Sequence, residues 1–138
     1  MKTFIFVCWA ALLPLCLHAQ AAPRTPDTRL SALYDADYLQ RLQTLQPAQL
    51  ERLNFYLDHS YSVESLPQGK TVDNLPTIDW AAEGFNILVF ERDNQVQRQK
   101  TQPVYYHIRN SDTMLVLWSE DEFVKQFNAA TGRGYPQK

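Results

Sequence analysis

The sequence predicts an α+β fold: two N-terminal helices, a three- to four-stranded, mainly antiparallel sheet, and a C-terminal helix packed on that sheet. Three observations favour this class. Leucines recur at helical spacing between residues 30 and 59, segments rich in β-branched and aromatic residues follow between 85 and 118, and a strong helix start comes after them. No helical pattern separates the strand segments, so a parallel α/β sheet is disfavoured.

An export signal precedes this fold. Lys2 makes the N-terminus positive, and residues 4–17 form an uncharged apolar run. The run is long enough for the core of a signal peptide, while a membrane-spanning helix needs about 20 residues, so an uncleaved anchor is disfavoured. We therefore predict that residues 1–21 are a signal peptide and that the protein is exported, either to the periplasm or out of the cell.

The end of the signal contains two candidate cleavage sites, which give different mature N-termini. Residues 19–21 read Ala-Gln-Ala, a small-residue cleavage pattern that starts the mature chain at Ala22, and cleavage after Ala19 is the alternative. Lipid attachment at Cys16 is disfavoured, because the bulky Leu15 occupies the position where a small residue is needed.

Composition bounds the mature chain. Both cysteines, Cys8 and Cys16, lie in the signal, so the fold is expected to stand without disulfides or thiolate metal sites. Removing 21 residues from 138 leaves 117, with 12 basic and 15 acidic residues and a formal net charge of −3. This charge disfavours nucleic acid as a partner, and no apolar run after the signal is long enough to span a membrane.

The mature chain divides into three parts. Residues 22–29, with prolines among small polar residues, are predicted to be a flexible leader. Residues 30–132 are predicted to form a single globular domain, and residues 133–138 a tail.

Two short amphipathic helices are predicted between residues 30 and 59. Gln46-Pro47 separates them, and Pro47 suits the first turn of the second helix because its missing N–H has no helical partner there. The apolar positions recur at steps of three and four, at Leu39, Leu42, Leu45, Leu50, Leu53 and Leu57.

The middle of the chain is predicted to start the sheet. Residues 61–64 alternate in polarity as an edge strand, and 66–77 form a loop with Pro and Gly. Residues 78–83 are expected to make one helical turn closed by Gly84. Residues 85–90 are rich in Phe, Ile and Val and are predicted to be a central strand.

A hairpin of two strands is predicted next. Residues 104–108 and 113–118 are the strands, joined by a turn at 110–112. The polar stretch 92–102 is expected to protrude from the sheet as a long hairpin that turns at Asp93-Asn94.

The C-terminal helix carries the clearest local signals. Residues 119–122 read Ser-Glu-Asp-Glu, a capping box with acids in the first turn. The helix is predicted over residues 120–131, stopped by Gly132, with Phe123, Val124 and Phe127 forming the apolar face.

Motifs for catalysis, metals and cofactors are weak. His59 and His107 are far apart in the chain, with no cysteine after the signal, so no metal site is predicted. Residues 58–60 read Asp-His-Ser, but a working triad brings its members together from distant positions. Asp79 and Glu83 would share a helical face, which alone does not indicate glycoside chemistry. No glycine-rich phosphate loop is present, and we predict no cofactor.

Aromatic residues are the enriched class. Tyr105 and Tyr106 point to opposite faces of a predicted strand, so one of them is expected to face outward. Together with Trp80 and His107 they are the candidate binding residues. The sequence therefore favours a non-enzymatic binding protein whose partner is a protein or a component of the cell envelope. The alternatives are a small exported hydrolase using His59 or His107 with a carboxylate, and a structural or carbohydrate-binding role.

Overall fold

The computed structural model describes residues 24–67, 74–80 and 84–135. In these ranges the elements follow the order η1 (Thr28–Ala32), α1 (Ala36–Leu45), α2 (Pro47–His59), β1 (Tyr61–Ser65), β2 (Thr77–Ile78), α3 (Ile87–Asp93), β3 (Val104–Ile108), β4 (Thr113–Leu117) and α4 (Glu120–Thr131). The strands form one four-stranded sheet, and the α+β class predicted from the sequence is confirmed.

The sheet has the strand order β1-β4-β3-β2. β4 pairs antiparallel with β1 and with β3, while the short β2 joins β3 in parallel. The predicted hairpin of β3 and β4 and the predicted edge strand at β1 are therefore present. Ile78 belongs to β2, so the helical turn predicted from residue 78 does not begin there, and residues 81–83 lie outside the described part.

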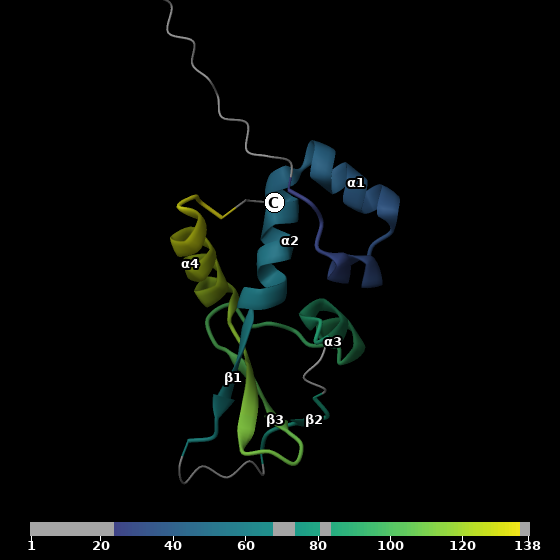
Figure 1. Ribbon diagram of the computed structural model, residues 1–138. Coiled ribbons are helices and arrows are strands. Elements are labelled where there is room, and N and C mark those ends of the chain that lie inside the picture. The colour runs from purple at the N-terminus through teal and green to yellow at the C-terminus, as the bar shows by residue number, and fades with distance from the viewer. Residues whose placement is uncertain (1–23, 68–73, 81–83, 136–138) are drawn as a thin grey trace, which may run out of the picture.

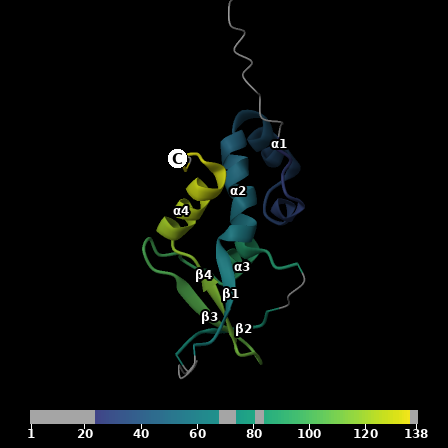
Figure 2. The same ribbon diagram turned by 60° about the vertical axis from the view of Figure 1, so that its left-hand side comes forward.

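The sheet occupies one end of the molecule, and α3 lies between it and the other helices (Figure 1). α1, α2 and α4 gather at the other end, and α2 leads directly into β1. α4 flanks α2 in both views (Figure 2). The main core runs through both ends, since leucines of η1, α1 and α2 join apolar residues of α3 and the sheet; its buried members are Leu30, Leu39, Leu42, Leu50, Leu53, Leu57, Ile78, Ile87, Ile108, Leu115 and Leu117.

The two N-terminal helices form as predicted. The Asp35 carboxylate caps α1 by accepting from the backbone N–H of Tyr38 at 2.7 Å, and Pro47 occupies the first turn of α2. Among the described residues, no helix is both long and apolar enough to cross a membrane.

The central strand predicted over 85–90 is wrong. Asn86 caps a helix instead: its Oδ1 accepts from the N–H of Leu88 at 3.1 Å and of Val89 at 3.4 Å, and α3 continues to Asp93. Ile87 is fully buried. Burial of this apolar side against the core therefore outweighs the strand preference of Ile, Val and Phe.

The polar hairpin predicted over 92–102 is also absent. The carbonyls of Gln99 and Lys100 accept from the N–H groups of Glu120 and Asp121, at 3.1 and 3.0 Å. This irregular segment thus satisfies helix-start donors of α4 that would otherwise lack a partner.

The C-terminal helix α4 is confirmed, and Ser119 Oγ accepts from the N–H of Glu122 at 3.2 Å. The Glu122 carboxylate contacts Lys125 at 3.3 Å. We expected the sheet as the neighbour of this helix, but its aromatic contacts are with α2. Phe127 meets Phe55 edge-on at 5.3 Å. We call this group the α2–α4 cluster; its members are Phe55, Phe123, Phe127 and Tyr135.

The first and last segments of the described chain are both tied to α2. The buried Glu51 carboxylate forms ion pairs with Arg24 and, at 3.2 Å, with Arg133. Arg29 is held by the carboxylates of Asp27 and Asp58 at 2.8 and 2.9 Å. Ordered contacts therefore extend into the segments predicted as leader and tail.

Candidate functional site

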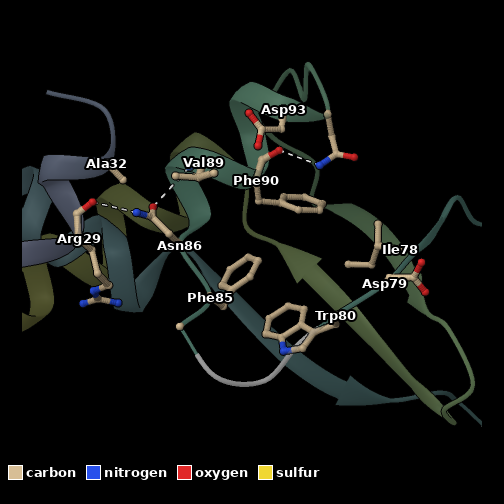
Figure 3. Close-up of a pocket in the computed structure, with 12 residues that line it drawn as sticks. Arg29, Ala32, Ile78, Asp79, Trp80, Phe85, Asn86, Val89, Phe90 and Asp93 are labelled. Carbon is tan, nitrogen blue, oxygen red and sulfur yellow. Dashed lines mark hydrogen bonds between the residues drawn. The ribbon is translucent and has the colours of Figure 1, made fainter.

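A pocket of about 480 Å³ lies between α3, the end of β2 and η1. Three aromatic side chains line it, Trp80, Phe85 and Phe90, and Figure 3 shows the first two beside each other with Ile78 nearby. Polar groups lie around these rings; they are Arg29, Asp79, Asn86, Asp93 and Asn94.

The pocket aromatics belong to a larger group, which we call the sheet-side cluster. Trp80 stacks on Phe85 with ring centroids 4.1 Å apart and planes 13° apart. Phe90 is 5.7 Å from Phe85 and meets Tyr106 edge-on at 5.3 Å, and Tyr61 contacts Phe85 at 4.9 Å. The cluster thus joins β1, β3, α3 and the segment after β2.

The direction of α3 builds this cluster. Asn86 Nδ2 donates to the Arg29 carbonyl at 2.9 Å, so the start of α3 is tied to η1. From this anchor the helix carries Phe90 toward the sheet while Phe85, just before the cap, packs on Trp80. Asn86 thereby ties the α3 wall of the pocket to η1.

The Arg29 guanidinium is not available to an anion in the pocket. Its nitrogens donate to both carboxylate oxygens of Asp27 and both of Asp58, at 2.8–3.0 Å. The Asp27 hydrogen bonds raise the pKa of Arg29 further above its ordinary value, and Asp58 adds to this effect. Two carboxylates around one guanidinium leave this corner of the pocket net negative.

The remaining polar groups are mainly acceptors. Asp79 pairs with Arg109 at 3.1 Å and Asp93 with Arg92 at 2.7 Å, both at exposed positions where ion pairs are weak. Asn94 uses its Nδ2 on the Phe90 carbonyl at 2.9 Å, which leaves its Oδ1 to accept. The pocket therefore combines an apolar lining with hydrogen-bond acceptors and negative charge.

The predicted binding residues divide between two faces of the sheet. Trp80 lines the pocket, and Tyr106 packs behind it on Phe90. Burial raises the pKa of Tyr106 above its ordinary value, and the charge of Glu91 adds to this. Tyr105 and His107 alternate with Tyr106 along β3 and so lie on the opposite face, where Tyr105 is 40 % exposed. The His107 Nε2 is 3.0 Å from the carbonyl of Ser111.

The residue types of a hydrolase triad at 58–60 make separate contacts. Asp58 binds Arg29, His59 stacks on Phe55 at 3.8 Å, and Ser60 Oγ donates to the Tyr56 carbonyl at 2.6 Å. Glu83, the predicted companion of Asp79, lies outside the described residues. Within the described ranges, no three His, Cys, Asp or Glu side chains gather as metal ligands.

A buried polar network lies between the two aromatic clusters. The Arg98 guanidinium binds the Glu91 carboxylate and the carbonyls of Ser60 and Trp118, and lies 4.8 Å from the Tyr56 ring centre. Tyr56 Oη donates to Glu91 at 2.9 Å. Burial raises the pKa of Tyr56 far above its ordinary value of 10.0. This network fastens α3 and the 94–103 segment to the junction of α2 with the sheet.

Sequence reasoning missed the pocket residues on α3 and just before it. Phe85 and Phe90 were assigned to a buried strand, although Asn86 before an apolar run is a helix-start signal that could have located α3. No family model matches the chain, and neither the curated proteins nor the solved structures compared with it give a match.

Proposed function

We propose that this protein is an exported, non-enzymatic binding protein of the cell envelope, and that its partner enters the pocket beside α3. The observation that carries the proposal is the composition of this pocket. An apolar aromatic lining meets a rim of acceptors, with Asp79 and Asp93 as carboxylates and Arg29 already neutralised. A pocket with apolar walls and a few polar groups at its edge is the usual form of a ligand site.

The chemistry of the rim selects the partner. A ligand that supplies hydrogen-bond donors and positive charge complements Asp79, Asp93 and the free oxygen of Asn94, whereas an anion would face unfavourable charge. The apolar lining favours an aliphatic body next to that charge. A polypeptide segment that presents an apolar side chain beside a lysine or arginine has both properties.

The packing of the rings argues against a carbohydrate platform. Phe85 covers one face of Trp80, and Tyr61 approaches the indole at 5.9 Å. Sugars stack on open ring faces, and Phe85 already occupies one face of Trp80. A side chain inserted among the ring edges fits the pocket better than a pyranose laid over one ring.

Tryptophan fluorescence offers a direct test. The chain has three tryptophans, and Trp9 lies in the predicted signal, so Trp118→Phe leaves Trp80 as the reporter in the mature protein. A capped peptide of alternating leucine and lysine is expected to change the Trp80 emission with saturation. The same peptide with glutamate in place of lysine, and a trimer of N-acetylglucosamine, are expected to leave it unchanged.

Matched variants locate the binding. Asp79→Asn combined with Asp93→Asn should weaken the lysine peptide at least about tenfold, because it removes both rim charges. Tyr105→Ala, on the other face of β3, should leave the affinity unchanged. Saturable binding of the sugar, or equal binding of both peptides, would refute the proposed partner class.

Export is tested separately by intact mass. The protein recovered after expression of the full chain should lack residues 1–21, or 1–19 for the alternative cleavage, and carry no lipid. A diacylglycerol adduct on Cys16 or retention of the whole leader would contradict this part of the proposal.

A further inference from the structure

The outer edge of β1 carries backbone groups that have no partner among the described residues. β1 is an end strand of the sheet, bonded on one side to β4. Trp118 donates its N–H to the Ser60 carbonyl at 3.0 Å and Leu66 donates to the Asp112 carbonyl at 2.8 Å, so even-numbered residues of β1 face β4. In an antiparallel pair the alternate residues turn their N–H and C=O away, which places Tyr61, Val63 and Ser65 on the open side.

Nothing among the described residues bonds to these backbone groups. The central residue of the edge, Val63, is 49 % exposed, one of the most exposed large apolar side chains in the described chain. Natural proteins block such edges with charged side chains, prolines, bulges or covering elements, because an open edge accepts another strand. β1 has no proline, its register with β4 runs without a bulge, and its one charged residue is Glu64.

We propose that β1 pairs antiparallel with β1 of a second copy of this chain, with the two Val63 residues facing each other on the two-fold axis. In this register Tyr61 faces Ser65 of the second copy. Three facing pairs then exchange two hydrogen bonds each, so every open N–H and C=O of both edges is satisfied. The result is one continuous sheet across two molecules.

The side chains of β1 favour this register over its neighbours. It sets Glu64 of each copy against Ser62 of the other, so a hydroxyl that now donates to Glu64 in its own chain at 2.7 Å can donate across the interface. Sliding the strands to centre on residue 64 places the two Glu64 carboxylates directly opposite and pairs fewer backbone groups. Like charges directly opposite in a sheet are destabilising. In this register every open backbone group of both edges is paired and no like charges face each other, which favours a second copy over an unrelated peptide.

Charged substitutions of Val63, the residue on the two-fold axis, test the pairing. Sedimentation of the protein expressed from the full chain should show a dimer forming between about 1 µM and about 1 mM. Val63→Lys and Val63→Glu should each be monomeric over this range, because like charges meet at the axis. Mixing the two variants should restore a dimer that contains one of each, whereas Val63→Thr should dimerise like the wild type.

The outcomes are distinct from those of the peptide test. Val63 is not among the residues that line the pocket, so both charged variants should retain the Trp80 response to the lysine peptide. A wild type that stays monomeric throughout, or charged variants that dimerise alone as well as mixed, would overturn the β1 pairing while leaving the pocket proposal intact.

Discussion

The two aromatic clusters use the same kind of side chain in different settings. In the α2–α4 cluster, Phe123 and Phe127 are only 3 % and 2 % exposed, while Phe55 and Tyr135 at its border are half-buried. Every ring of the sheet-side cluster is half-buried, and three of them line a pocket. Rings closed between two helices contribute packing alone, whereas rings at the junction of a short helix, a two-residue strand and a sheet leave part of their surface open.

This difference shows where accessible aromatic surface arises in the described chain. Both clusters contain rings about 4–6 Å apart, so ring contact does not distinguish them. The distinction lies in what closes the cluster. Tyr135 and α4 close the first, while the second ends in polar groups that face the pocket.

The largest effect is expected from removing the centre of the closed cluster. Phe127→Ala should lower the free energy of unfolding by about 3–5 kcal/mol, since it deletes a fully enclosed ring and leaves a cavity. Urea denaturation measures the change, with Phe127→Leu as the control that should cost less. A loss below about 1 kcal/mol would show that α4 does not pack tightly on α2.

The network between the clusters should give the next largest effect. Arg98→Met leaves the mostly buried Glu91 carboxylate without its cation, at a cost of about 3 kcal/mol. Adding Glu91→Gln should recover part of the loss. Lys125→Met, which breaks an exposed pair with Glu122, is the control and should leave the urea midpoint almost unchanged. Equal urea midpoints for Arg98→Met and Lys125→Met would mean that the Arg98–Glu91 pair stabilises the protein no more than an exposed ion pair does.

A smaller loss of stability, combined with a loss of binding, is expected in the open cluster. Phe85→Ala should cost about 1–2 kcal/mol, less than Phe127→Ala, because the ring is only half-buried. Its affinity for the lysine peptide should fall at least about tenfold, since the ring packs on Trp80 in the pocket wall. Unfolding curves and peptide titrations of both Phe variants separate packing from binding. Similar losses for the two variants in both assays would contradict the proposed difference between the two clusters.

The smallest effect on stability is expected at alkaline pH, and it concerns Tyr56, which lies between the two clusters. Because burial raises the Tyr56 pKa, the folded state keeps this phenol neutral while the unfolded chain ionises near pH 10. The free energy of unfolding is therefore unaffected by ionisation of Tyr56 well below pH 10. As the pH rises above 10, ionisation of Tyr56 in the unfolded chain lowers this free energy, by about 0.8 kcal/mol at pH 10.5. Urea melts at pH 8 and pH 10.5 should show a smaller difference for Tyr56→Phe than for wild type. The same difference in both proteins would contradict a buried phenol.

The hairpin and α4 could be predicted because their local signals agree with the tertiary structure. Asn110 adopts a positive φ of 58° in the turn between β3 and β4, a conformation that Asn tolerates. Ser119 caps α4 as its sequence position indicated. At 85–90 the local preferences conflict: β-branched and aromatic residues favour a strand, while Asn86 favours a helix start, and packing of Ile87 into the core decides the outcome.

The candidate site was predictable only in part. Trp80 and Tyr106 could be singled out as aromatic residues, but their meeting with Phe85 and Phe90 depends on the direction of α3. Arg98 lies in a stretch whose composition predicts exposure. Its side chain is only 9 % exposed, because Glu91 and the carbonyls of Ser60 and Trp118 supply acceptors from other elements, which no local pattern reveals.

Glu51 makes this chain a candidate for circular permutation. By binding both Arg24 and Arg133, it brings the two ends of the described chain to the same stretch of α2, away from the sheet (Figure 1). A short glycine-rich linker can join ends that already meet, and new termini can be opened at the exposed Asn110 turn. Such a permutant would carry its free termini at the turn between β3 and β4, at the sheet end of the molecule, instead of beside α2.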